Sequence, residues 1–66
     1  MIGSWLSRQT LRRIEVHTTE GRTLSGTLRT VARDGLVLSV ARYLDDDIAL
    51  GGDVFVPREQ IAFIQA

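Results

Sequence analysis

Residues 54–64 read VFVPREQIAFI, which is the most distinctive arrangement in the chain. It contains two short apolar runs, at 54–56 and 61–64, and each has the length and composition of a β-strand. Pro57 separates the runs: its ring fixes φ and it has no N–H group to donate, so it ends the first strand and begins a tight helical turn over 57–60. Strand edges this apolar and uncharged associate when they are exposed. We therefore expect the two strands to pair between subunits.

Further strand and turn signals precede this stretch. Apolar and polar residues alternate over 13–19, as in a half-buried strand. A turn follows at Gly21, because glycine accepts the positive φ that hairpin turns need. The next strand contains Gly26, which favours a sharp bend. After a turn at Gly35, residues 36–41 are apolar on both faces, which predicts the most buried strand.

Together these signals predict a mostly β fold. Residues 1–12 are expected to form an N-terminal helical segment of about two turns, and residues 13–66 a bent barrel of five short antiparallel strands. Residues 45–53, the longest polar stretch, are expected to be a loop. A chain of 66 residues buries only about 60% of its unfolded surface. It has no cysteine for a disulfide and only one histidine, so oligomerisation is the expected compensation.

The charges are sorted along the chain although they sum to zero. Residues 1–33 carry six arginines and two acidic residues, whereas residues 34–66 carry two arginines and six acidic residues. No apolar run is long enough for a membrane span, and the apolar start is too short for a signal peptide. We therefore expect a soluble protein of a reducing compartment, with no membrane partner.

The order of these signals resembles the Sm/LSm family over residues 13–65. The first Sm motif has an apolar strand, an acidic–glycine turn, a Gly-x-Leu in a bent second strand, and a buried third strand. The residues in these places are Ile14-Glu15-Val16, Glu20-Gly21-Arg22, Gly26-Thr27-Leu28 and Leu36-Val37-Leu38. The second motif, two apolar strands around an Arg-Gly turn, is matched by residues 54–64 without a gap.

This resemblance implies a non-enzymatic Sm-like barrel that assembles with copies of itself into a ring. The expected subunit interface consists of Val54, Phe55, Val56, Ile61, Phe63 and Ile64. In Sm rings the N-terminal helix lies on one face, and the loop between the third and fourth strands projects from the other. By this analogy the ring has a basic face carrying Arg8, Arg12 and Arg13, and an acidic face carrying residues 45–47.

The chain departs from the Sm pattern at the residues that bind RNA. Sm proteins that bind uridine-rich RNA use an Asp and an Asn in the loop between the second and third strands, and the Arg of the second motif. Here the loop at 31–35 has no Asn, and Pro57 and Arg58 stand in the Arg and Gly positions. A base pocket needs an amide and a stacking plane. The resemblance therefore implies the barrel and the ring rather than this RNA pocket, although Arg33 and Arg58 supply charge.

The sequence also resembles small proteins that actinobacteriophages encode among their head genes. The similar residues are Arg12-Arg13-Ile14, Gly26-Thr27-Leu28, Leu36-Val37-Leu38 and Ala62-Phe63-Ile64-Gln65. This resemblance implies a structural or assembly component of a phage virion, in the capsid or head–tail region, located in the virion or the host cytoplasm. Other virion proteins would then be its partners. The alternative prediction is an RNA-binding module of the Sm or Hfq kind.

Six residues are the candidates for contact with nucleic acid or a protein partner. They are Trp5, Arg8, Arg12, Arg13, Arg33 and Arg58. The arginines near the N-terminus form either a binding patch, multiplied by ring symmetry, or a solvated helix face. Trp5 either anchors a partner or packs with its helix on the mouth of its own barrel.

No residue pattern predicts catalysis, a cofactor or a metal site. Asp45, Asp46 and Asp47 lack the spacing, glycine and final glutamate of a calcium loop, so we expect a solvated loop. Glu15 and His17 lie two apart on one strand face, but no nucleophile or third residue accompanies them. An ordinary outward-facing pair is therefore expected.

Overall fold

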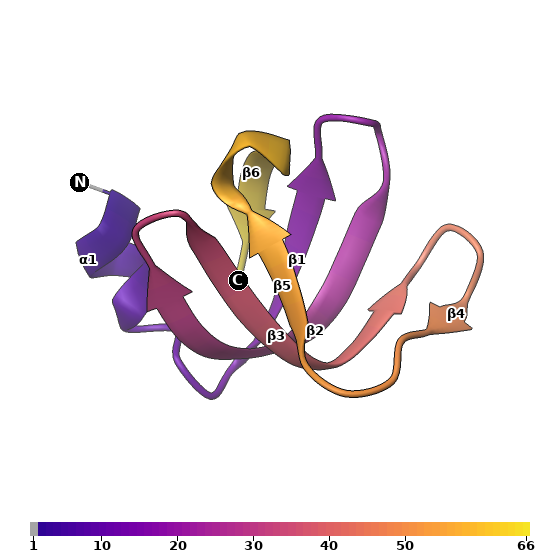
Figure 1. Ribbon diagram of the computed structural model, residues 1–66, viewed down its shortest axis with the longest axis horizontal. Helices are drawn as coiled ribbons and strands as arrows, with labels where there is room; N and C mark the ends of the chain where they lie inside the picture. Colours follow the sequence, from indigo (N-terminus) through magenta and orange to yellow (C-terminus); the bar gives the residue numbers. More distant parts are fainter. Residues whose placement is uncertain (1) are drawn as a thin grey trace.

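The computed structural model describes residues 2–66, with side chains from Trp5 onward, as a short helix followed by a strongly bent antiparallel sheet (Figure 1). The elements are α1 Ile2–Ser7, β1 Arg13–Thr18, β2 Thr23–Ala32, β3 Gly35–Tyr43, β4 Ile48–Ala49, β5 Val54–Pro57, the 3₁₀ turn η1 Arg58–Gln60 and β6 Ile61–Gln65. The mostly β fold with one short N-terminal helix is therefore confirmed.

The sheet is built around β2, which pairs with β1 on one side and β3 on the other. The strand order is β4-β3-β2-β1-β6, and β5 pairs separately with β3. Inward-facing apolar residues from these strands form a single core. Its buried members are Leu6, Ile14, Val16, Leu24, Leu28, Leu36, Leu38, Ala41 and Val56. The alternation over 13–19 and the apolar run at 36–41 therefore predicted core strands correctly.

The bend of the sheet is centred on Gly26, as its position in mid-strand predicted. A Cβ atom at this position would lie 3.1 Å from the Cβ of Leu38 and 3.3 Å from the Cα of Ala41. The register between β2 and β3 shifts here, because Val40 and Ala41 together face Gly26. Such a bulge bends a strand and increases its twist. Val40 accommodates it with a φ of 51°, which a β-branched residue rarely adopts.

The predicted count of five strands is wrong, because residues 13–66 form six. The additional strand is β4, which lies in the stretch expected to be a polar loop and pairs with Arg42 and Tyr43 at the end of β3. A left-handed residue, Asp47 with a φ of 55°, helps to turn the chain back into this short hairpin. Two residues are too few to show an alternating pattern, so no strand was predicted here.

The sheet is also not closed into a barrel. Among the described residues β5 pairs only with β3 and β6 only with β1, so each of the two strands has one free edge. The turn η1 connects them directly, which confirms the strand–turn–strand arrangement predicted for residues 54–64. This connection is only three residues long. It therefore holds β5 and β6 close in the chain, although the two strands do not pair with each other.

The helix is shorter than the predicted segment 1–12, since α1 ends at Ser7. Leu11 then takes a φ of 70° and donates its N–H to the carbonyl oxygen of Leu28 at 2.7 Å, which is already strand-like pairing with β2. The side chain of Leu6 is buried in the core, and this contact attaches α1 to the sheet. A helix this short would not persist without such packing.

Candidate functional site

The free edges of β5 and β6 differ in which side chains they expose. On β5, Val56 is buried in the core, Val54 is partly buried, and Phe55 points outward with 48% of its surface exposed. Its ring lies over Gly35, at a place where no side chain fits. Val54 and Val56, which were predicted to form the subunit interface, therefore pack on the protomer's own core. Phe55 is exposed and can contact a neighbouring subunit.

On β6 the same alternation separates inner from outer residues. Ile61 and Ile64 are partly buried against the core, whereas Phe63 is 54% exposed. Phe63 pairs across the ladder with His17 of β1, and their rings stack with centroids 4.2 Å apart. The Nε2 atom of His17 lies 2.9 Å from Oε1 of Gln65, so the imidazole is held in place from two sides.

A groove of about 800 Å³ lies between α1, the β2–β3 turn, η1 and β6. Its lining residues are Trp5, Leu6, Val31, Ala32, Arg33, Gly35, Leu36, Arg58, Ile61, Ala62, Phe63 and Ile64. Most of the lining is apolar, and the charged side chains in it are Arg33 and Arg58. The groove thus brings together three of the six residues predicted to bind a partner and three of those predicted to form the subunit interface.

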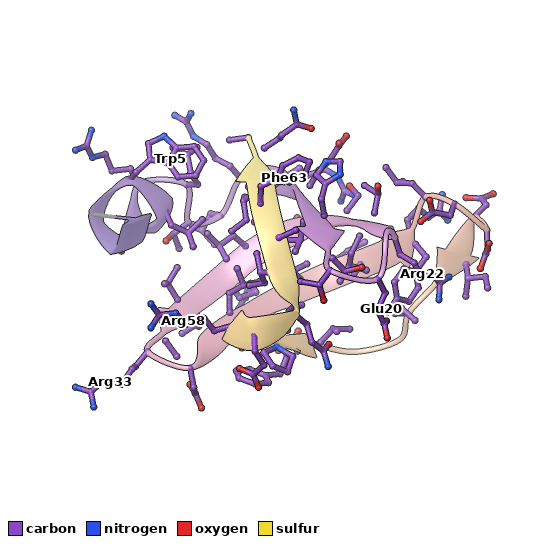
Figure 2. The ribbon with its side chains drawn as sticks, turned by 90° about the horizontal axis from the view of Figure 1, so that it is seen from above. Trp5, Glu20, Arg22, Arg33, Arg58 and Phe63 are labelled. Atoms are coloured by element: carbon purple, nitrogen blue, oxygen red, sulfur yellow. The ribbon has the colours of Figure 1, made fainter. Side chains whose placement is uncertain are left out.

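A backbone hydrogen bond brings the two arginines of the groove to the same end. The N–H of Arg58 donates to the carbonyl oxygen of Asp34 at 2.8 Å, which joins η1 to the β2–β3 turn. Figure 2 shows Arg33 and Arg58 at the α1 end of the molecule, with the Arg33 side chain extending away from it. Among the described residues neither guanidinium group makes an ion pair, so both charges are available to a ligand.

Of the other candidate residues, Trp5 shares the groove with this arginine pair and Arg8, Arg12 and Arg13 lie outside it. Trp5 is 41% exposed and lies on α1 at the groove, so it both packs on its own domain and presents a free surface. Arg8 and Arg12 are exposed. Arg13 belongs to a second, smaller hollow on the outer face, where its guanidinium donates to Oγ of Ser25 at 3.0 Å. The structure therefore does not place Arg13 in the groove with Arg33 and Arg58.

The acidic loop lies at the opposite end of the molecule from α1 (Figure 1). Its carboxylates are engaged rather than free. Arg22 contacts Asp46 at 2.6 Å while stacking over the ring of Tyr43, and Arg42 contacts Asp47 at 3.1 Å. Asp45 accepts a hydrogen bond from the N–H of Thr23 at 2.8 Å. The loop is exposed to solvent, as expected, and the structure adds that Arg22 and Arg42 pair with two of its carboxylates.

Nothing in the described residues assembles into a metal centre. No group of three or more His, Cys, Asp or Glu side chains from residues 2–66 converges as ligands would. Oε1 of Glu15 lies 3.7 Å from Nε2 of His17 on the outer face, where Thr23, Gln65 and Phe63 also contact the imidazole. Across the described chain no helix is both long and apolar enough to cross a membrane.

Sequence reasoning did not anticipate the groove. Its apolar wall includes Val31, Ala32 and Ala62, which had suggested only loop and strand positions. The wall forms because α1 packs across the end of β2 through Leu6, a contact between segments distant in sequence. Trp5 and Phe63 can each be recognised in the sequence as apolar residues. No local pattern indicates that they line the same groove.

A bent antiparallel sheet of this strand order, preceded by a short helix, with two short C-terminal strands joined by one 3₁₀ turn, defines the Sm-like class of fold. Solved structures match it, two archaeal proteins among them. A novel Sm-like archaeal protein from Pyrobaculum aerophilum superposes with a TM-score of 0.86 at 22% identity, covering 96% of this chain and 48% of that one. The SmAP (LSm) protein from Methanococcus vannielii superposes with a TM-score of 0.84 at 12% identity, covering 96% of this chain and 91% of that one.

These matches establish the fold, and the chain spans about half the length of the Pyrobaculum protein. No family profile and no curated protein matches the sequence. Both proteins come from cellular organisms and not from phages. The predicted role in a phage virion thus has no support from the comparisons, whereas the Sm/LSm resemblance predicted from residues 13–65 is confirmed at the level of the fold.

Proposed function

We propose that the protein is a non-enzymatic Sm-like module that forms a homo-oligomeric ring and binds single-stranded RNA at the Arg33–Arg58 end of its groove. The fold match and the sequence motifs support this proposal together. The observation that carries it is the hydrogen bond from Arg58 N–H to the Asp34 carbonyl, because it brings two unpaired guanidinium groups to one end of an apolar groove.

The ring follows from the two free strand edges. If β5 of one subunit pairs with β6 of the next, the backbone groups along both edges gain partners, and the exposed rings of Phe55 and Phe63 are covered. The two surfaces are different, so the contact is head-to-tail and closes into a ring when the rotation permits. The neighbouring subunit would then cover the β6 side of the groove. The end of the groove that carries Arg33 and Arg58 would stay exposed on the ring.

RNA is favoured over other polyanions by the pairing of charge with aromatic surface. Single-stranded nucleic acid is bound by arginines that contact the backbone and by aromatic side chains on which bases stack. The groove provides both, with Arg33 and Arg58 at one end and the exposed face of Trp5 along it, while Phe63 is left to the contact between subunits. The ring would repeat this arrangement around its axis and so bind one strand at several subunits.

Native mass spectrometry tests the ring. We expect the main species to be an integral multiple, five-fold or larger, of the 7.3 kDa chain, as in a closed ring. A monomer at micromolar concentration would contradict this half of the proposal. An assembly whose mass increases continuously with concentration would also contradict it, because it would indicate head-to-tail pairing that does not close.

Fluorescence anisotropy with short labelled RNA strands tests the binding. We expect single strands to bind more tightly than duplex RNA at every salt concentration, because only unstacked bases reach the aromatic faces. Replacing Arg33 and Arg58 together by alanine should abolish binding. Arg42→Ala is the matched control, since Arg42 pairs with Asp47 far from the groove. Equal loss with the control, or equal binding of heparin and RNA, would show a nonspecific charge effect.

A further inference from the structure

We propose that the groove selects guanine, and that Arg58 is the residue that reads it. This inference rests on the proposed RNA-binding function and specifies its ligand. It follows from a chemical imbalance in the groove lining: the polar side chains in it are Trp5, Arg33 and Arg58, and all three are hydrogen-bond donors only. None of the lining side chains can accept a hydrogen bond.

A lining of this kind discriminates between the four bases. Guanine presents two acceptors, O6 and N7, side by side on its Hoogsteen edge, and an arginine fork matches both. Its own donors, N1–H and the amino group, lie on the other edge and can stay in water while O6 and N7 face the groove. Adenine places an amino donor beside N7, and cytosine has an amino donor on its exposed edge. Uracil has a donor at N3 beside the O4 acceptor. Each of these donors would lose its bonds to water in the groove without gaining a side-chain acceptor, which costs free energy.

The sequence also lacks an amide side chain at the loop position where the Sm pattern has one. Loop 31–35 carries no Asn, and Pro57 and Arg58 replace the expected Arg-Gly of the second motif. A guanidinium thus projects from η1 at a position where the resemblance led us to expect glycine. The change adds a fork-shaped donor at η1, and the lining of the groove contains no amide acceptor to read the donor of a uracil.

The two arginines have different positions and so different roles. Arg33 extends away from the molecule in Figure 2, into the space where the backbone of a bound strand would run. Arg58 is fixed at its backbone by the bond to Asp34, which holds the start of its side chain at the mouth of the groove. We therefore assign a phosphate contact to Arg33 and the contact with the guanine edge to Arg58, with Trp5 as a stacking surface.

The volume of the groove is consistent with one base. Sites for small ligands enclose roughly 300–1,000 Å³, and the groove here has about 800 Å³. A single guanine fills part of it and leaves the β6 side for the neighbouring subunit. One base per subunit is therefore the expected stoichiometry at saturation.

The test uses the full-length protein and four labelled RNA strands, each a short oligoadenylate with one central position varied. The central base is guanine, inosine, 7-deazaguanine or adenine. Inosine keeps O6 and N7, and 7-deazaguanine lacks N7. We expect the guanine and inosine strands to bind about tenfold more tightly than the other two, the discrimination expected of one bidentate arginine contact.

Variants that keep the positive charge test whether Arg58 is the residue that contacts the guanine edge. Arg58→Lys keeps the positive charge but loses the fork, so it should remove the preference for guanine while leaving the affinity for the adenine strand nearly unchanged. Arg33→Lys should keep the preference. A folded Arg58→Lys variant that still prefers guanine overturns the assignment to Arg58.

The outcomes separate this inference from the function on which it rests. If the wild-type protein binds all four strands equally, or if 7-deazaguanine binds as well as guanine, the guanine inference is wrong and RNA binding stands. If no strand binds, or if polyglutamate competes as well as RNA does, both are wrong.

Discussion

His17 and Phe63 stack on the outer face of the sheet, with ring centroids 4.2 Å apart and ring planes within 11° of parallel. The pair joins β6 to β1, which is the single ladder that holds β6 in the described protomer. Because the other edge of β6 is free, this side-chain contact supports the strand on which the proposed subunit pairing depends. An aromatic pair contributes about 0.5–1.5 kcal/mol beyond its burial.

A double-mutant cycle measures that contribution. We expect His17→Ala and Phe63→Ala to be coupled by about 0.5–1 kcal/mol in the free energy of unfolding, the lower part of the range because Phe63 is half exposed. Urea unfolding at one protein concentration provides the values. The control cycle pairs His17→Ala with Phe55→Ala, whose ring lies over Gly35 instead. Equal coupling in the two cycles would show that the stack has no energetic role.

The bend at Gly26 makes a second prediction. Gly26→Ala should lower the free energy of unfolding by about 1–3 kcal/mol, because the new Cβ would press on Leu38 and Ala41 in the closely packed core. Gly51→Ala is the matched control, since a Cβ there would meet nothing within 4 Å. Thermal unfolding followed by circular dichroism gives both values. If the two substitutions destabilise equally, the bend does not require close approach at Gly26.

Much of the sheet could be predicted because its signals are local. The alternation over 13–19 and the turn at Gly21 depend on neighbouring residues, and so does the strand–turn–strand stretch at 54–64. Strand β4 could not be predicted, because it is two residues long and Ile48 and Ala49 become a strand only by pairing with Tyr43 and Arg42 of β3. Tertiary geometry therefore produces a strand that the residues themselves do not indicate.

The candidate site was predicted less completely than the sheet. Arg33 and Arg58 could be proposed from their loop positions, but their meeting depends on the backbone bond to Asp34. Such a bond involves no side chain and leaves no trace in the sequence. The ion pairs of the acidic loop were missed for a related reason: Arg22 reaches Asp46 across 24 positions of the chain, a pairing that charge counting cannot reveal.

The strained backbone of Val40 makes a third prediction. A residue with a Cβ pays roughly 1–2 kcal/mol in the left-handed region, and Val40 holds a φ of 51° while its side chain is 73% exposed. Asparagine tolerates this region better, so Val40→Asn should raise the free energy of unfolding by about 1 kcal/mol in urea titrations. Val40→Ile keeps the branch and should bring no gain. A lower free energy of unfolding in the Val40→Asn variant would show that the backbone of Val40 is not strained.

The free edge of β5 makes the last prediction. Phe55→Asp should dissociate the assembly, because pairing with β6 of the next subunit would bury a carboxylate against an apolar surface. The isolated protomer should stay folded, since Phe55 is already about half exposed. Native mass spectrometry reports the assembly and circular dichroism the fold. Val40→Asp is the control: it adds the same charge to an exposed position of β3, away from both free edges.

Comparing the two variants locates the contact between subunits. A folded Phe55→Asp protein with monomeric mass, alongside a Val40→Asp protein that assembles as the wild type does, indicates a seam along β5. Full-size assembly of the Phe55→Asp protein would place the seam elsewhere. Dissociation of both proteins would mean that added negative charge, and not its position at the free strand edge, opposes association.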